Sequence, residues 1–325
     1  MGARLFGASV LRREDARLVT GRGRYVADVT LPGMLHVAVH RSPHARARVV
    51  SVDGTGALAR PGVVAITAPA DVARFPRLPL LVPHPSLRSP ACPELLPADE
   101  VSYVGQGVAL VVAESRERAE DALESLWVEY EPLPAVVTLE QALADGGPRV
   151  HPTGNLAARF GQRLGDPSAA LARADLVLRE RFHVHRGTGI AMETRGIVAH
   201  YDRDLEQMTV WSTIQAPQIL RRVLATYLGM PEHAVRVVTR DIGGGFGPKT
   251  IVYPEDILVP LLARQLAARS SGSKTAARTW WRPRRSATSG TRSRSASRAR
   301  ARSSDCGTAS STTAAPSCPG ESSCR

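Results

Sequence analysis

The chain has 325 residues, of which 43% are hydrophobic, and its 42 basic and 30 acidic side chains give a formal net charge of +12. A chain of this length normally holds two domains. No apolar run reaches the roughly 18 residues of a membrane span, and the first residues lack the apolar core and cleavage site of a secretory signal. We therefore expect a cytoplasmic protein without a membrane-spanning segment.

The positive charge is concentrated at the C-terminal end. Residues 267–325 hold 12 basic side chains and two acidic ones, a local net charge of +10, whereas the first 266 residues have a net charge of only +2. Three of the four cysteines also lie in the last 20 residues, and their spacing matches no CxxC metal site. A nucleic-acid partner, which strong positive charge would suggest, therefore concerns the tail alone.

The first region, residues 17–134, combines strands with a helix. Apolar and polar residues alternate over 33–42, which predicts a half-buried strand. Further strands are predicted over 62–67, 107–115 and 126–133, and a helix over 116–126 has its apolar residues on one face. The proline-rich stretch 76–97 predicts an irregular loop. A sheet with a packed helix indicates an α+β fold.

A linker at 135–162 leads to the second region, residues 163–266. Strands are predicted over 176–186, 196–202, 208–213 and 234–242. Helices are predicted over 216–229, which Gly229 would end, and over 253–266, with Pro254 in the first turn. An N-terminal segment, 1–16, and a tail, 267–325, flank these two regions.

A glycine-rich loop, residues 241–249 (DIGGGFGPK), lies between the last predicted strand and the last helix. Consecutive backbone amides in such a loop can face an anion or an oxo group. The loop is not a Walker A motif, because Pro248 separates Gly247 from Lys249, and Phe246 interrupts the GxGxxG pattern of dinucleotide sites. The alternative to a ligand-binding loop is a tight turn around a packed phenylalanine.

The tail contains no Leu, Ile, Val, Met, Phe or Tyr, so it lacks the side chains that build a core. It predicts either a disordered Arg/Ser-rich segment or a nucleic-acid-binding arm. GC-rich coding DNA read in a shifted frame gives the same composition. A frame moved by one base permits GRPVKW(I/V)EDRREDLV after Leu266, which is strand-like and amphipathic. We therefore predict a frameshift near Leu266, followed by a disordered tail.

Four motifs of the second region together resemble a known family. They are METRG (192–196), VWSTIQAPQ (210–218), the GGGFGxK of the loop and YPED (253–256). They resemble the molybdopterin-binding large subunit of the xanthine oxidase, aldehyde oxidase and carbon monoxide dehydrogenase family of molybdenum hydroxylases. Residues 12–49 and 104–136 look like the a/b hammerhead domain of the same subunits, so the resemblance covers residues 10–266.

The resemblance implies a hammerhead domain over 17–134 and an incomplete molybdopterin-binding domain over 163–266. It also implies oxidation or hydroxylation of an aldehyde, an N-heterocycle or carbon monoxide with oxygen from water. The implied cofactor is molybdenum–molybdopterin, in its cytosine dinucleotide form. The implied partners are an FAD-binding medium subunit and a [2Fe-2S] small subunit, in a homodimer of heterotrimers.

The resemblance also implies cofactor-binding residues. Gln215 matches a glutamine that hydrogen-bonds an oxo ligand of the metal, a role that suits an amide because it donates without titrating. Gly244, Gly245, Phe246 and Gly247 match the loop beside the pterin and the metal. For Gln215 the alternative is a solvent-facing position at a helix start, and for Lys249 it is a solvated cation. The pterin holds the metal, so we expect His183, His185 and His200 to be structural.

The chain departs from the family pattern at two positions and lacks a general base. Thr194 replaces a proline, and Thr250 replaces a glutamate that helps bind purine and aldehyde substrates, which argues against a purine substrate. In the family that the chain resembles, a glutamate activates the metal-bound hydroxyl. That glutamate lies near the C-terminus of chains more than twice as long as this one. We therefore assign no catalytic residue, and we expect this chain to be inactive alone and to retain molybdenum poorly.

Two other hypotheses stay open from the sequence. One is a standalone protein, not an enzyme, whose basic tail binds nucleic acid. The other is a hammerhead domain that docks on partner subunits as a non-catalytic piece. The substrate also stays open among carbon monoxide, aldehydes and N-heterocycles.

Overall fold

The computed structural model describes residues 6–80, 82–87, 92–184, 187–269, 276–281, 290–294 and 310–314. Helices and strands alternate along the first and second regions, so the predicted α+β fold is confirmed. In these described ranges, no helix is both long enough and apolar enough to cross a membrane.

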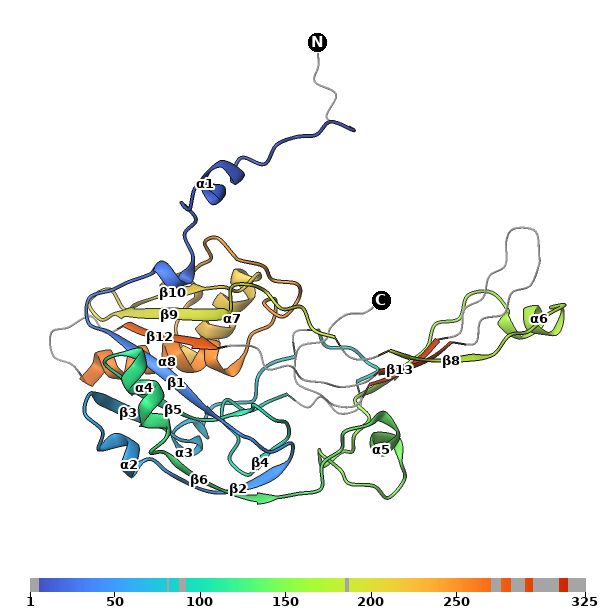
Figure 1. Ribbon diagram of the computed structural model, residues 1–325, viewed down its shortest axis with the longest axis horizontal. Helices are drawn as coiled ribbons and strands as arrows, with labels where there is room; N and C mark the ends of the chain where they lie inside the picture. The colour runs from blue at the N-terminus through green and yellow to red at the C-terminus, as the bar shows by residue number, and fades with distance from the viewer. Residues whose placement is uncertain are drawn as a thin grey trace, which may run out of the picture.

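The two regions share one twisted sheet (Figure 1). Among the described residues it has the strand order β11-β10-β9-β12-β1-β5-β3. Its strands are β1 (Met34–Arg41), β3 (Val63–Thr67), β5 (Gly107–Ala113), β9 (Arg195–Asp202), β10 (Gln207–Ser212), β11 (Val235–Val238) and β12 (Ala276–Trp281). The first region contributes β1, β5 and β3, and the second contributes β9, β10 and β11.

Strand β12 joins these two halves. It pairs parallel to β1 on one side and antiparallel to β9 on the other. We expected residues after 266 to have no regular structure, but they include β12, β13 (Gly290–Arg294) and β14 (Ser310–Ala314). The expectation rested on missing aliphatic side chains, whereas strand pairing uses the N–H and C=O groups of the main chain, which nearly every residue has.

One face of the first region's strands is covered by α4 (Arg116–Leu123). The Ser115 hydroxyl caps its N-terminus by accepting the Arg118 N–H at 3.3 Å. Ala119 and Ala122 are buried against the sheet, as the apolar face of the predicted helix requires. Strand β5 is an apolar run that is buried on both faces.

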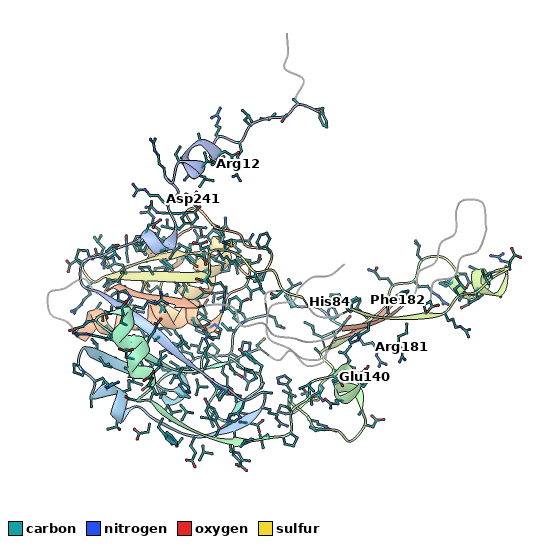
Figure 2. All side chains as sticks on the ribbon, in the orientation of Figure 1. Arg12, His84, Glu140, Arg181, Phe182 and Asp241 are labelled. Carbon is teal, nitrogen blue, oxygen red and sulfur yellow. The ribbon has the colours of Figure 1, made fainter. Side chains whose placement is uncertain are left out.

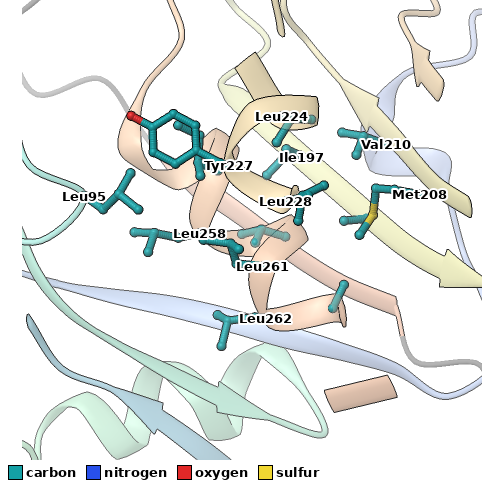
Figure 3. Packing of buried hydrophobic residues seen from close by; sticks show 14 of the residues in the cluster. Leu95, Ile197, Met208, Val210, Leu224, Tyr227, Leu228, Leu258, Leu261 and Leu262 are labelled. Atoms are coloured by element: carbon teal, nitrogen blue, oxygen red, sulfur yellow. The ribbon is translucent and has the colours of Figure 1, made fainter. Parts of the chain in front are cut away.

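Two helices cover the strands of the second region (Figure 3). Helix α7 (Pro217–Leu228) ends at Gly229, whose φ of +60° is the left-handed conformation predicted for a glycine that ends a helix. Helix α8 (Pro254–Arg269) is apolar along most of its length and lies inside the core. Leu224, Leu258 and the strand residue Ile197 belong to the same buried cluster.

A second, small sheet completes the first region. It has the order β4-β2-β6, with β4 (Glu100–Val101), β2 (Ala47–Asp53) and β6 (Trp127–Pro132). The short helices of the molecule are α1 (Asp15–Val19), α2 (Thr55–Leu58), α3 (Pro69–Val72), α5 (Leu139–Leu143), α6 (Pro167–Ala172), η1 (Val26–Asp28) and η2 (Glu232–Ala234). The proline-rich stretch forms no helix or named strand within its described parts, as predicted.

An arm extends from the body (Figure 1). It contains α6 and the sheet β7-β14-β13-β8, with β7 (Ala158–Phe160) and β8 (Glu180–Val184). β8 is shorter than the strand predicted over 176–186, of which residues 185–186 lie outside the described residues. Helix α5 lies inside the predicted linker, and the Thr138 side chain caps its N-terminus.

Candidate functional site

The glycine-rich loop follows β11 and lies beside Gln215, two residues before the start of α7. The Gln215 N–H donates to the Lys249 carbonyl at 2.8 Å. The Thr250 hydroxyl donates to Gln215 Oε1 at 3.2 Å. The structure therefore brings Gln215 to the loop residues that the sequence groups with it, although they are about 30 residues apart in the chain.

The Gln215 amide packs directly on the loop backbone at Gly245. A Cβ at residue 245 would overlap the Cδ, Nε2 and Oε1 atoms of Gln215. Only glycine permits this close approach. Because Oε1 accepts the Thr250 hydroxyl, the amide Nε2 is the group that can donate to a ligand. Gln215 is exposed, so this donor is accessible from outside the fold.

Phe246 is an exposed aromatic side chain in a left-handed backbone conformation. Its φ is +52°, and the residue is 69% exposed. The alternative of a packed phenylalanine is therefore wrong. The ring lies over Gly244, where a Cβ would come within 2.8 Å of Phe246 Cε2. A non-glycine residue in this conformation persists only when its surroundings impose it, which is common at ligand sites.

A buried ion pair lies under the loop. Lys249 Nζ is 2.9 Å from Glu193 Oε2, and the two side chains are 3% and 11% exposed. The same Glu193 oxygen accepts the Gly243 N–H at 2.8 Å. Lys249 is therefore not the solvated cation that we considered. Sequence reasoning missed Glu193 entirely, although it belongs to the METRG motif, because no local pattern shows that its partner lies 56 residues away.

The first residue of the loop, Asp241 (Figure 2), is held by residues 17–24 of the first region. Arg17 forms an ion pair with Asp241, whose carboxylate also accepts the Arg24 N–H at 2.7 Å. The hydrogen bond from Arg17 and the one from Arg24 lower the pKa of Asp241 to about 2. The charged carboxylate thus ties the start of the loop to residues 17–24.

Charged side chains also meet where β1, β9 and α8 come together. Arg41 Nη2 is 2.6 Å from Glu255 Oε1, and the Arg195 guanidinium lies 3.3 Å from the centre of the Tyr253 ring. Burial lowers the pKa of Arg195, and burial raises the pKa of Asp256 to about 7. This cluster links the first region to the helix that follows the loop.

His200 is half-buried on β9, His183 is exposed on β8, and His185 lies outside the described residues. In the part of the chain that the structure describes, no group of three or more His, Cys, Asp or Glu side chains is arranged to hold a metal ion.

Comparison with known protein families identifies two domains. The model of the aldehyde oxidase and xanthine dehydrogenase a/b hammerhead domain matches residues 20–134, and the model of the molybdopterin cofactor-binding domain matches residues 150–271. Together they cover the body of the chain in the expected order.

Individual relatives agree with these domains. The nicotine 6-hydroxylase large subunit of Paenarthrobacter nicotinovorans is 36% identical over 265 residues, which cover 81% of this chain and 32% of that protein. The carbon monoxide dehydrogenase large chain of Afipia carboxidovorans is 37% identical over 262 residues, which cover 76% and 32%. The solved structure of quinoline 2-oxidoreductase from Pseudomonas putida 86 is 38% identical with a TM-score of 0.77, over 89% of this chain and 37% of that one.

The chain thus spans about a third of the length of the curated relatives that it matches. The matched domains hold the Gln215 and glycine-rich loop motifs, and the solved relative shares the fold. This chain belongs to the molybdopterin-binding large subunits of the xanthine oxidase, aldehyde oxidase and carbon monoxide dehydrogenase family.

Proposed function

We propose that this chain supplies part of a molybdopterin site in an enzyme that oxidises or hydroxylates an aldehyde, an N-heterocycle or carbon monoxide. The observation that carries the proposal is the Gln215 amide, which Thr250 orients and which packs on Gly245. The relatives are named for nicotine hydroxylation and carbon monoxide oxidation, which supports the reaction class.

The donor groups of the loop fit such a cofactor. The N–H groups of Gly244, Gly245, Phe246 and Gly247 donate no hydrogen bond to any described residue. At Gly247, with φ +93°, nothing lies within 4 Å of where a Cβ would be. Molybdopterin carries a phosphate and its metal carries oxo ligands, and both accept hydrogen bonds from backbone amides of this kind.

When bound, the cofactor supplies the metal and its oxygen ligands through the pterin dithiolene. The proposed role of Gln215 is to donate its amide N–H to an oxo ligand, and that of Gly244, Gly245, Phe246 and Gly247 is to line the pterin and the substrate. We also propose the cytosine dinucleotide form of the cofactor. Since no general base is assigned to these residues, the proposed site alone does not complete catalysis.

The Thr250 contact supports a proposal about the substrate. Its hydroxyl donates to Gln215, so this side chain orients the amide and presents no carboxylate to a substrate. A site with a threonine here lacks the acidic partner that recognises a purine in related enzymes. We therefore propose carbon monoxide, an aldehyde or a non-purine heterocycle as the substrate.

We propose an FAD-binding medium subunit and a [2Fe-2S] small subunit as partners, in a cytoplasmic dimer of heterotrimers. The names of the relatives, a "large subunit" and a "large chain", support an assembly of several subunits. The test is co-expression with these two classes of subunit and size-exclusion chromatography, where a larger species that contains all three chains is expected.

The frameshift near Leu266 also remains a proposal. It is supported by the absence of aliphatic residues after 266 and by the match to the molybdopterin cofactor-binding domain, which ends at residue 271. The nucleotide sequence around codon 266 tests it. An uninterrupted frame that encodes the tail as printed contradicts it.

A nucleic-acid-binding tail is a second candidate, because residues 267–325 have a net charge of +10. Such a tail would bind RNA or DNA with an affinity that falls steeply as salt rises. A binding titration across a salt series, with Arg298, Arg300 and Arg302 replaced by glutamine in the control chain, separates this candidate from a tail without function.

Cofactor binding tests the main proposal. The purified chain is mixed with molybdopterin released from another molybdoenzyme, and bound pterin and molybdenum are measured with Gln215→Ala and the matched control Gln218→Ala. Gln218 is an exposed glutamine in the first turn of α7, so its substitution controls for the loss of a surface amide. We expect weak binding by the wild type, weaker binding by Gln215→Ala and no change for Gln218→Ala.

Equal binding by all three chains would contradict the assigned role of Gln215. The same samples also test whether the chain is active alone. We expect poor retention of molybdenum and no dye-linked dehydrogenase activity. Stoichiometric molybdenum together with such activity would show that the chain is competent without further residues.

A further inference from the structure

Gly243, near the start of the glycine-rich loop, and Lys249, at its end, bond to the same carboxylate oxygen of Glu193. Glu193 Oε2 accepts the Gly243 N–H at 2.8 Å and lies 2.9 Å from Lys249 Nζ. The Glu193 N–H in turn donates to the Gly243 carbonyl at 3.2 Å. We propose that Glu193 and Lys249 are positioning residues, which hold residues 243–249 in the conformation that presents Gln215 and Phe246. The inference rests on the proposed function for what the loop binds, but not for how the loop is held.

The burial of the pair shows that it acts within the protein. Lys249 is 3% exposed and Glu193 is 11% exposed, so neither side chain is placed to meet a dissolved substrate. A buried charge is costly unless a partner compensates it, so each of these groups constrains the other strongly. The other carboxylate oxygen, Glu193 Oε1, is buried and accepts no hydrogen bond from the described residues. All described side-chain bonding of Glu193 is therefore directed at the loop.

The loop needs such a constraint because of its backbone. Gly244 and Gly247 have φ of +95° and +93°, and Phe246 has φ of +52°. Glycine populates many other conformations, and a phenylalanine disfavours this one. A loop of this composition stays in one conformation only when both of its ends are held. The Glu193 oxygen holds one end through Gly243 and the other through Lys249.

The same constraint reaches Gln215. The Lys249 carbonyl accepts the Gln215 N–H at 2.8 Å, so the backbone position of Lys249 also sets that of Gln215. The conformations of Phe246 and Gln215, two exposed residues of the candidate site, therefore depend on the Glu193–Lys249 pair, to which Gln215 is joined through its backbone N–H. This makes Glu193 and Lys249 positioning residues and not catalytic ones.

The test replaces the pair by apolar residues of similar size, Glu193→Leu together with Lys249→Met. An apolar pair avoids a lone buried charge, so the fold is expected to survive while both tethers are lost. Hydrogen exchange of the backbone amides is measured by mass spectrometry in the cofactor-free chain. We expect exchange over residues 243–250 to be about tenfold faster, with exchange in α7 unchanged. The control is Arg48→Met with Glu131→Leu, which removes an exposed pair (56% and 54% exposed) far from the loop.

Gly243→Ala tests the same contact from the loop side. A Cβ at residue 243 would lie 2.6 Å from the Cβ of Glu193, so the new methyl group pushes the two segments apart without removing a charge. We expect faster exchange over 243–250 here as well. If the apolar pair also loosens α7, this second variant decides the matter.

Wild-type exchange over residues 243–250 in both the apolar pair and Gly243→Ala would overturn the proposal. Molybdopterin binding is measured on the same samples, and about a tenfold loss of affinity in both variants is expected. If exchange rises as expected but the wild-type chain binds no molybdopterin, the proposed function fails while the positioning role stands.

Discussion

Two ion pairs, one in the first region and one in the second, differ in burial. In the first region, Arg48 pairs with Glu131 while the two side chains are 56% and 54% exposed. In the second region, Lys249 pairs with Glu193 under the glycine-rich loop, where both are buried. Exposed pairs typically contribute about 0–1 kcal/mol, whereas breaking a buried pair costs about 3–5 kcal/mol. The buried Glu193–Lys249 pair is thus placed to constrain a loop, whereas the exposed Arg48–Glu131 pair constrains little.

The largest expected effect comes from breaking the buried pair on one side. Lys249→Met leaves the Glu193 carboxylate buried without its cation, so we expect the free energy of unfolding to fall by about 3–5 kcal/mol. Arg48→Met is the matched change in the first region and should cost less than about 1 kcal/mol. Urea denaturation of both variants measures the difference. Similar losses of stability in Lys249→Met and Arg48→Met would remove the distinction between the buried and the exposed pair.

A smaller effect is expected at the contact between the loop and Gln215. Gly245→Ala places a methyl group on the Gln215 amide and should displace it, with little cost in stability because the amide ends an exposed, flexible side chain. Affinity for molybdopterin should fall about tenfold. Gly161→Ala is the control, because nothing lies within 4 Å of its Cβ position. Binding and thermal unfolding are compared for the two alanine variants, and equal affinities would mean that the amide is not part of the site.

The buried carboxyl at the junction of the two halves predicts a pH dependence. Burial raises the pKa of Asp256 from 3.8 to about 7, so the folded state keeps a proton there that the unfolded state has lost. The contribution of Asp256 to the free energy of unfolding should therefore be fully present below pH 3.8, fall as pH rises through this window, and be lost above about 7. Asp256→Asn keeps an oxygen for the Tyr253 N–H and should remove this slope. Unfolding measured from pH 4 to 8 tests it.

The carboxyl at the start of the loop gives the opposite sign and the smallest effect in that range. The pKa of Asp241 is lowered from 3.8 to about 2, so its contribution to stability is present above 3.8 and is lost as pH falls through about 2. Asp241→Asn should therefore leave the slope between pH 4 and 8 unchanged and act only below it. If Asp241→Asn changed the slope of stability against pH between 4 and 8 and Asp256→Asn did not, Asp256 would not be the group that titrates in this range.

Local patterns predicted the regular elements of the body. The apolar face of the helix over 216–229, closed by a glycine, and the apolar run of β5 are short-range features, and the structure has both. The structure also brings Gln215 to the glycine-rich loop, as grouping the motifs by family implied. Hydrophobic periodicity and turn chemistry depend on neighbours in the chain, so the amino-acid order is sufficient to find them.

The tertiary structure decided the features that depend on distant partners. Lys249 is buried because Glu193, 56 residues away, meets it. The backbone of Phe246 packs against Gly189, where a Cβ would lie 2.5 Å from the Phe246 Cβ. Strand β12 pairs through its main chain with both β1 and β9, which lie far from it in the sequence. The sequence by itself thus determined which segments fold and which family they belong to, while charge burial, loop conformation and strand pairing were decided only when distant segments came into contact.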